Sequence, residues 1–416
     1  MNSIKRITII LIGCQILSFP VVTHAMNLLQ PADTLVRPPY DRHARYNVNM
    51  IVETGWQSKN FDDCGPVSSP LHIWQTQQNG LAMLKGFPEG DPANTLSNRL
   101  HANDDGVRGH FKVCGDLNIP FAGSLGARFF FSPNWFVSVH LPMYHMRLRN
   151  VSFIDQTGDA VDADYRVKTL LTNDFATHVR RLGGMRLGDW ARTGIGDVSS
   201  TLNWYRDFPQ AKELLKNARI NWRVGLTLPT GKPTDLDLLF APGFGYGGVG
   251  LPVGLGLDLM FGGCIQTGLD LQLIHIFGRS EEVRVKTDIN QTELLLLQKT
   301  CAYRDFGLIQ RFNLYIGADK CVKGLSCLVG YQFLKHGADH LALSSNVLSQ
   351  TIANTAESLK ERTAHHIVVN VSYDFAVHTW NKKHAHPYFS VFTRIPFNGK
   401  RFASNIFVGW VLSVDF

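Results

Sequence analysis

Three closely spaced histidine pairs are the residues whose type and spacing could do chemistry, by binding a metal ion. Imidazole nitrogens are common zinc ligands, but a zinc site in a protein needs three or four ligands in total. Each pair lies at the end of an expected strand or in a loop, where histidine is commonly just a polar interfacial residue. The sequence therefore predicts no metal site. The pairs are His336/His340, His365/His366 and His384/His386.

Two glycine-containing segments resemble nucleotide-binding loops but fail on their context. Gly243 to Gly248 satisfies the G-x-G-x-x-G pattern, yet Gly250 and Pro252 follow where a dinucleotide fold needs a helix. Leu228 to Pro233 lacks the glycine spacing and the hydroxyl residue of a phosphate-binding loop. No G-x-S-x-G or H-E-x-x-H motif occurs. We expect no cofactor and no catalytic residues, with a lipid-modifying barrel enzyme as an alternative that has no short local signature.

Composition limits the class of protein. The 416 residues are 44% hydrophobic and 18% charged, with a formal net charge of +7. So small a charge on so long a chain is no nucleic-acid footprint, and we expect no nucleic-acid partner. Outside the N-terminus, no long apolar run resembles a membrane-spanning helix. The 37 glycines and 26 phenylalanines suit strands that pack closely and meet an apolar phase.

The N-terminus is typical of an export signal. Met1 to Arg6 is basic, Ile7 to Val22 is apolar, and Thr23-His24-Ala25 is a small-residue cleavage site. We predict a signal peptide over residues 1–25 and a short periplasmic segment over residues 26–44. Leu11 to Cys14 also resembles a lipobox, but cleavage there would leave a second apolar run behind it.

The cysteines remaining after removal of that signal are even in number, which permits disulfide bonds in an exported protein. Cys321 and Cys327 are close enough in sequence to connect across a hairpin turn. Cys64 and Cys114 bracket one long polar segment. We favour these two pairs as disulfides, while spacing alone leaves the connectivity open.

The C-terminal residues alternate apolar and polar side chains with the period of a β-strand. Trp410, Leu412, Val414 and Phe416 fall on one face. A terminal phenylalanine after such an alternation looks like the C-terminal signal of bacterial outer-membrane barrels. We therefore predict these four residues as the membrane-insertion signal, with the barrel-insertion machinery as the partner that reads it.

The same alternation recurs along the chain and predicts twelve strands. Most reach the roughly 9 to 11 residues that a tilted strand needs to cross a bilayer. Connections after even strands are short and those after odd strands generally long, as in outer-membrane barrels. The expected strands are 45–57, 121–131, 134–148, 195–206, 219–230, 249–261, 265–277, 303–318, 325–335, 365–376, 386–396 and 404–416.

The fold class predicted from these strands is all-β: a transmembrane antiparallel up-and-down β-barrel over residues 45–416. Its long extracellular loops, with short helices, are expected at 58–120, 149–194 and 337–364. An additional hairpin at Arg108 to Leu117 would raise the number of strands to fourteen.

The strand faces opposite the apolar ones define the expected interior. Charges there can stay solvated or pair, whereas an arginine at mid-depth on the lipid face would cost roughly 2 to 4 kcal/mol. Because both signs of charge occur, the interior is either an ion-pair network that closes it or a narrow water-filled path. The predicted pore-lining residues are Arg128, His140, Arg223, Asp258, Asp270, Arg311, Asp374 and Arg394.

Two segments carry a family resemblance. Gly194 to Arg206 (GIGDVSSTLNWYR) and Arg223 to Lys232 (RVGLTLPTGK) resemble the G-x-G-D strand and the L-P-T-G strand end of the outer-membrane proteins of the phenol meta-pathway type, relatives of the fatty-acid channels. The resemblance implies passive uptake of small, often apolar molecules across the outer membrane. No binding residue of the family carries over by position.

We therefore expect a channel in the bacterial outer membrane that lets small solutes pass, including small apolar or aromatic compounds, and no enzyme. Its expected partners are outer-membrane lipid, the insertion machinery and the solutes. The alternative is a non-conducting structural or adhesive surface protein that acts through its extracellular loops.

Overall fold

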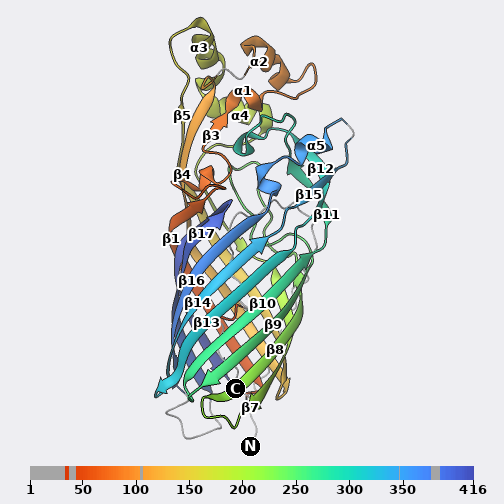
Figure 1. Ribbon diagram of the computed structural model, residues 1–416. Coiled ribbons are helices and arrows are strands. Elements are labelled where there is room, and N and C mark those ends of the chain that lie inside the picture. Colours follow the sequence, from red (N-terminus) through yellow and green to blue (C-terminus); the bar gives the residue numbers. More distant parts are fainter. Residues whose placement is uncertain (1–32, 37–43, 104–105, 346, 376–384) are drawn as a thin grey trace, which may run out of the picture.

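The protein folds into a closed β-barrel with a large loop region at one end (Figure 1). The computed structural model describes residues 33–36, 44–103, 106–345, 347–375 and 385–416. The predicted signal peptide at 1–25 lies outside these residues. Among the described residues, no helix is both long and apolar enough to cross a membrane.

The barrel wall consists of twelve antiparallel strands, as predicted. The first strand pairs with the last strand on one side and with the second wall strand on the other, which closes the cylinder. The wall strands are β1 (Tyr46–Phe61), β4 (His110–Ser132), β5 (Trp135–Asp155), β7 (Val198–Pro209), β8 (Leu215–Leu228), β9 (Gly250–Phe261), β10 (Ile265–Ile276), β13 (Ile309–Val322), β14 (Leu325–His336), β16 (Arg362–Asp374), β17 (His386–Lys400) and β18 (Phe402–Asp415).

Two strand predictions differ in detail from the structure. Arg108 to Leu117 is no additional hairpin, because the residues from His110 onward continue β4, which pairs with β5 along almost its whole length. The expected strand 303–318 is divided into β12 (Lys299–Asp305) and β13. The chain breaks there because the Gly307 amide turns to donate to the Asp339 carboxylate at 2.8 Å instead of to a neighbouring strand.

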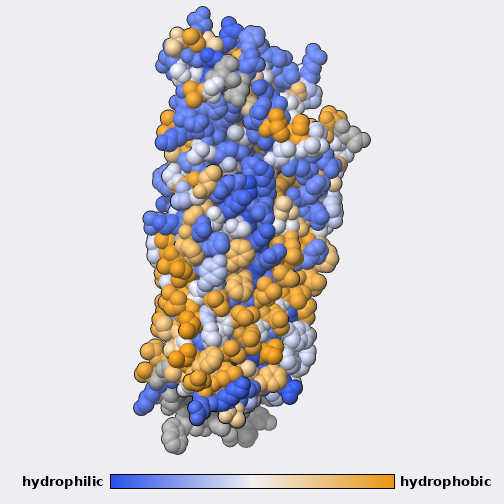
Figure 2. Space-filling view, in the orientation of Figure 1, coloured by the Kyte–Doolittle hydropathy of each residue, from blue (hydrophilic) through white to orange (hydrophobic). Residues whose placement is uncertain are grey.

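An apolar belt surrounds the barrel, because every second residue of the wall strands points outward and is apolar. On β16, Ile367 and Val371 are 42% and 44% exposed, whereas His366 and Val368, which flank Ile367, are fully buried. Figure 2 shows the hydrophobic side chains over the barrel and the hydrophilic ones over the loop region. At the end opposite the loops, aromatic rings form a girdle, with Trp135 and Trp222 packed edge to face at 5.3 Å. Such a belt and girdle define a transmembrane barrel.

The loop end is a folded region with its own core. It contains a three-stranded sheet of β11 (Arg279–Arg284), β12 and β15 (His340–Leu343), together with β2 (Pro66–Val67), β3 (Gln77–Asn79) and β6 (Trp190–Ile195). The short helices predicted for the loops are present. They are α1 (Gly80–Met83), α2 (Pro92–Leu100), α3 (Asp162–Val167), α4 (Phe175–Gly183) and α5 (Gln350–Ala353).

The start of the described chain, residues 33–36, lies inside the barrel and belongs to the span 26–44 that the sequence predicts as a periplasmic segment. The Asp33 carboxylate accepts hydrogen bonds from the side-chain amides of Asn313 and Gln332, at 3.1 and 2.6 Å. The Leu35 carbonyl accepts another from Asn370 at 3.0 Å. We call residues 33–36 the luminal segment. It is held inside because the barrel wall satisfies its carboxylate and carbonyl groups.

Candidate functional site

The eight predicted pore-lining residues all lie on the inner face of the wall. Seven of them are buried, and Asp374 is half-buried beside a cavity at the end away from the loops. The alternation that places apolar residues in the belt therefore places these charges inside.

The best-defined charge pair in the lumen joins β8 to β10 across the intervening strand. Arg223 donates from both terminal nitrogens to the Asp270 carboxylate, each at 2.7 Å, and both side chains are buried. Gly254 on β9 makes this reach possible, because a Cβ atom there would lie 2.7 Å from the Arg223 guanidinium carbon. Inward-facing glycines on a strand such as β9 therefore indicate in the sequence that a long side chain from a neighbouring strand extends across it.

Other inward-facing charges also have partners. Arg394 donates to the Glu53 carboxylate at 2.6 and 2.9 Å, and the Tyr315 hydroxyl donates to Asp258. Arg311 is 2% exposed, and its hydrogen bond to Gln272 is long, at 3.4 Å. The lumen therefore contains two buried pairs of opposite charge, Arg223–Asp270 and Arg394–Glu53, each of which joins the strands on either side of an intervening strand.

A polar cavity of about 330 Å³ lies at the end of the barrel away from the loops. Thr34 and Leu35 of the luminal segment form one of its walls. Lys320 and Asp374, also in the lining, form an ion pair at 2.6 Å. The luminal segment therefore borders this cavity.

A second, apolar pocket of about 110 Å³ lies among the loops at the other end. Trp74 and Phe240 pack edge to face at its side, with ring centroids 5.4 Å apart. The lining comes from five separate connections between wall strands, so no single sequence segment could reveal it. Its apolar lining is Trp74, Met185, Leu236, Leu238, Phe240, Ala241, Pro242, Leu294 and Leu296.

The charged side chains of this apolar pocket are engaged by the protein itself. Arg284 donates to the carbonyl groups of Leu236, Leu297 and Gly183 at 2.6 to 2.7 Å. Glu293 accepts from the Glu357 amide at 2.6 Å. Burial raises the pKa of Glu293, although hydrogen bonds from neighbouring groups oppose the shift. The pocket thus presents mainly hydrocarbon to a ligand.

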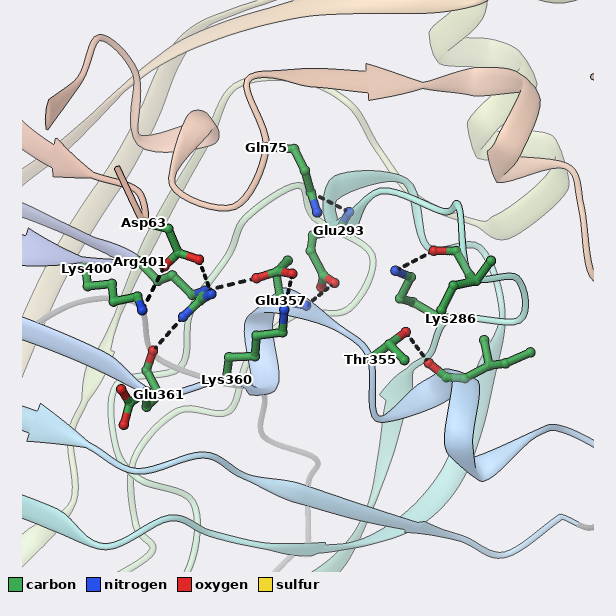
Figure 3. A network of polar contacts seen from close by, with 12 residues as sticks. Asp63, Gln75, Lys286, Glu293, Thr355, Glu357, Lys360, Glu361, Lys400 and Arg401 are labelled. Carbon is green, nitrogen blue, oxygen red and sulfur yellow. Dashed lines mark hydrogen bonds and ion pairs between the residues drawn. The ribbon is translucent and has the colours of Figure 1, made fainter. Parts of the chain in front are cut away.

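A network of ion pairs fastens the loop next to this pocket to the barrel rim. Figure 3 shows Arg401 between Asp63 and Glu357. Its Nε donates to Glu357 at 3.0 Å, and a terminal nitrogen donates to the Glu361 carbonyl at 3.2 Å. Because Glu357 also donates its amide to Glu293, the network connects the end of β1, the β17–β18 turn and the pocket wall.

A second ion cluster holds the three-stranded sheet above the barrel mouth. Arg304 donates to Glu281 at 3.2 Å and to Asp339 at 2.6 Å, and all three side chains are buried. Burial alone would raise the pKa of Asp339, but the charge of Arg304, together with smaller contributions from His336, Arg362 and the Gly307 amide, lowers the pKa overall. This cluster therefore depends on ionised Asp339.

The histidine pairs do not converge. His365 lies on the outer face, where its Nδ1 is 2.7 Å from the Tyr331 hydroxyl, whereas His366 is buried inside. His336 is buried next to Asp339, and His340 is exposed. Adjacent strand residues point to opposite sides of a wall, which explains the separation. His384 lies outside the described residues, and among those described no cluster of three potential metal ligands occurs.

Neither favoured disulfide is present. Cys64, Cys114 and Cys327 are free thiols, so both predicted pairs are wrong, while Cys264 is disulfide-bonded. Cys327 lies opposite Ala318, and not opposite Cys321, in the pairing of β13 with β14. The side chain of Cys321 is outside the described structure. Cys64 and Cys114 are separated because β1 and β4 stop pairing at Gly55 and Ile119.

The residues of the predicted insertion signal lie on the outward face of the C-terminal end of the chain, along β18. Leu412 and Phe416 are 43% and 60% exposed, and Trp410 pairs in register with Val52 of β1. The signal therefore sits at the seam that closes the barrel. Recognition by insertion machinery stays a prediction.

No protein-family model matches the chain, and no curated protein sequence matches it significantly. Among solved structures, the chain is similar to an outer membrane channel from Pseudomonas putida F1, with 12% identity, a TM-score of 0.48, and coverage of 93% of this chain and 100% of the other. It is also similar to the CymD monoaromatic hydrocarbon channel, with 8% identity, a TM-score of 0.31, and coverage of 90% and 89%. A Pseudomonas aeruginosa FadL homologue shares 9% identity, with a TM-score of 0.28 and coverage of 89% of each chain.

Proposed function

We propose that this protein is an outer-membrane channel for small apolar solutes of about the size of one aromatic ring. The observation that carries the proposal is the apolar pocket among the loops, above a barrel with an apolar belt. Long loops mark the extracellular end of such barrels and short turns the periplasmic end. The pocket would then be the first binding site that a solute meets from outside.

The lining and size of the pocket favour an apolar ligand. Arg284 and Glu293 are already bonded within the protein, so a polar solute would lose water without gaining their hydrogen bonds. A dry cavity of about 150 Å³ lined by apolar side chains holds benzene. A pocket of about 110 Å³ that is open on one side is close to that size.

The remaining path runs through the lumen to the polar periplasmic cavity. The luminal segment stands between them, because Asp33 and Leu35 are bonded to the wall above the cavity. A solute that follows the whole lumen has to pass this segment. An apolar solute would also leave a polar cavity readily, which suits release into water.

A second candidate function, a non-conducting surface protein, is favoured by the same luminal segment and by the ion pairs across the lumen. In that case the folded loops would act on a partner and nothing would pass. Conductance in planar bilayers separates the two candidates, because the surface protein would fold and stay silent.

The test of the channel is uptake of radiolabelled toluene by cells that carry the protein in their outer membrane. Leu238→Trp fills the pocket, and Ile289→Trp is the matched control, because Ile289 is 56% exposed outside the pocket lining. We expect uptake above that of cells without the protein, lost in Leu238→Trp and kept in Ile289→Trp. Uptake that never exceeds the background would reject the channel, and equal uptake by both variants would reject the pocket as its entrance.

A further inference from the structure

The outer face of β5 changes from apolar to basic above the belt. Met146 and Leu148 are fully buried in the core of the loop end, so the alternate residues face away from the protein. These are His145, Arg147 and Arg149, of which Arg149 is exposed and the other two are half-buried. Three successive outward positions of one strand thus carry basic side chains.

The height of these residues matches the headgroup layer rather than the hydrocarbon. Met143 is the last apolar outward residue before them. A strand rises about 3.3 Å per residue and is tilted by about 45° in a barrel, so Arg147 lies roughly 9 Å above Met143. The side chain therefore reaches the layer where lipid phosphates lie.

A lysine from another loop joins these residues. His145 Nδ1 is 2.6 Å from the Thr193 hydroxyl on β6, and Lys232 donates to the Thr193 carbonyl at 3.1 Å. Lys232 is exposed. We call His145, Arg147, Arg149 and Lys232 the β5 basic patch.

The charges of the patch lack carboxylate partners in the described structure. Arg147 donates its Nε to His145 at 2.7 Å, and no hydrogen bond from its terminal nitrogens occurs among the described residues. Asp116, opposite Arg149 in the ladder, accepts from Asn150 at 2.8 Å, and Asp189, next to the β5–β6 pairing, accepts from the Val151 amide at 2.9 Å. The planar ends of both arginines are therefore available for a bidentate anion.

Two basic residues elsewhere on the same rim have acidic partners. Lys335 on β14 pairs with Glu361 at 2.8 Å, and Lys400 on β17 pairs with Asp63 at 3.6 Å. Two rim lysines thus form ion pairs, whereas the arginines of the β5 basic patch form none among the described residues. The difference points to an anion supplied from outside the protein at the patch.

We propose that the β5 basic patch binds the phosphate groups of a phosphorylated glycolipid of the outer leaflet. The apolar belt directly below the patch would contact the acyl chains of the same lipid, while the two guanidinium groups hold its phosphates. The proposal rests on the orientation of the barrel in the membrane and not on solute transport. Loss of lipid binding and loss of toluene uptake are therefore separate outcomes.

The test titrates the purified full chain, in nanodiscs of zwitterionic lipid, with bisphosphorylated lipid A. Arg147→Gln/Arg149→Gln removes the patch charge, and Lys335→Gln/Lys400→Gln is the matched control at the same rim. We expect the arginine variant to bind roughly thirtyfold more weakly, the loss for two arginines near an anionic lipid surface. The control should bind as the unaltered protein does, and heat-modifiable gel migration verifies that each variant is folded.

The proposal would be overturned by equal weakening in both variants or by undiminished binding by the arginine variant. Equal binding of dephosphorylated lipid A would also overturn it, because it would show that the acyl chains alone are recognised. Inorganic phosphate that competes at the concentration of the lipid would likewise show a free-anion site. Arg147→Lys/Arg149→Lys keeps the charge and should retain most of the affinity, so a complete loss in it would also count against the proposal.

Discussion

Replacement of Asp270 by asparagine should destabilise the barrel strongly, because it leaves the Arg223 charge without its carboxylate. The two terminal nitrogens of Arg223 are 2.7 Å from the Asp270 oxygens, and the side chains are 3% and 1% exposed. Unit charges about 4 Å apart attract by about 4 kcal/mol at an effective dielectric constant of about 20. Breaking a buried pair by removing one partner costs about 3–5 kcal/mol.

The matched control is Asp207→Asn, which breaks the Arg219 pair at the periplasmic end. That pair has the same chemistry at 2.8 Å, but the Arg219 side chain is 26% exposed, so we expect a loss of about 1 kcal/mol or less. The assay is urea unfolding in lipid vesicles, followed by tryptophan fluorescence. Equal, small losses in both variants would refute the reasoning and show that water in the lumen solvates Arg223 as well as bulk solvent does.

Three further predictions follow from individual contacts. Gly330→Leu should displace the luminal segment, because a Cβ at Gly330 would lie 2.7 Å from the Leu35 side chain. We expect the ion conductance in planar bilayers to rise, and unchanged conductance would show that the segment does not obstruct the lumen. The pKa of Asp339 is lowered in the folded protein, so its contribution is complete above the unfolded pKa of about 4 and is lost as the pH falls through the folded pKa. Limited proteolysis of the β11–β12–β15 sheet should therefore accelerate below about pH 4, and Arg304→Gln should flatten this dependence. Cys64 and Cys301 are exposed free thiols and should react with maleimide without a reductant. If Cys64 reacted only after reduction, it would be part of a disulfide bond.

The sequence predicted which way the charged side chains face but not which of them form pairs. Alternation predicted that Arg223 and Asp270 both face inward, since the side-chain period of a strand is two. It could not predict that they meet, because they lie on β8 and β10 and depend on the register of β9 between them. The absence of a side chain at Gly254 decides that contact. The disulfide predictions failed for the same reason, because spacing along the chain does not give register between strands.

The luminal segment and the apolar pocket needed the tertiary structure for a different reason. Asp33 is bonded to Asn313 and Gln332, some 300 positions further along the chain, and no local pattern marks such a contact. The pocket likewise exists only where five loops pack together.

What the sequence by itself determined is the barrel: the number of wall strands, the outward apolar face, the inward charges and the end that carries long loops. These features follow from local periodicity and from the cost of exposing polar groups to lipid, so the residues of each strand determine them independently of the other strands. Only the tertiary structure decided which charges pair, what lies inside the barrel and where an apolar solute could bind. Those features depend on contacts between segments far apart in the chain, which periodicity does not encode.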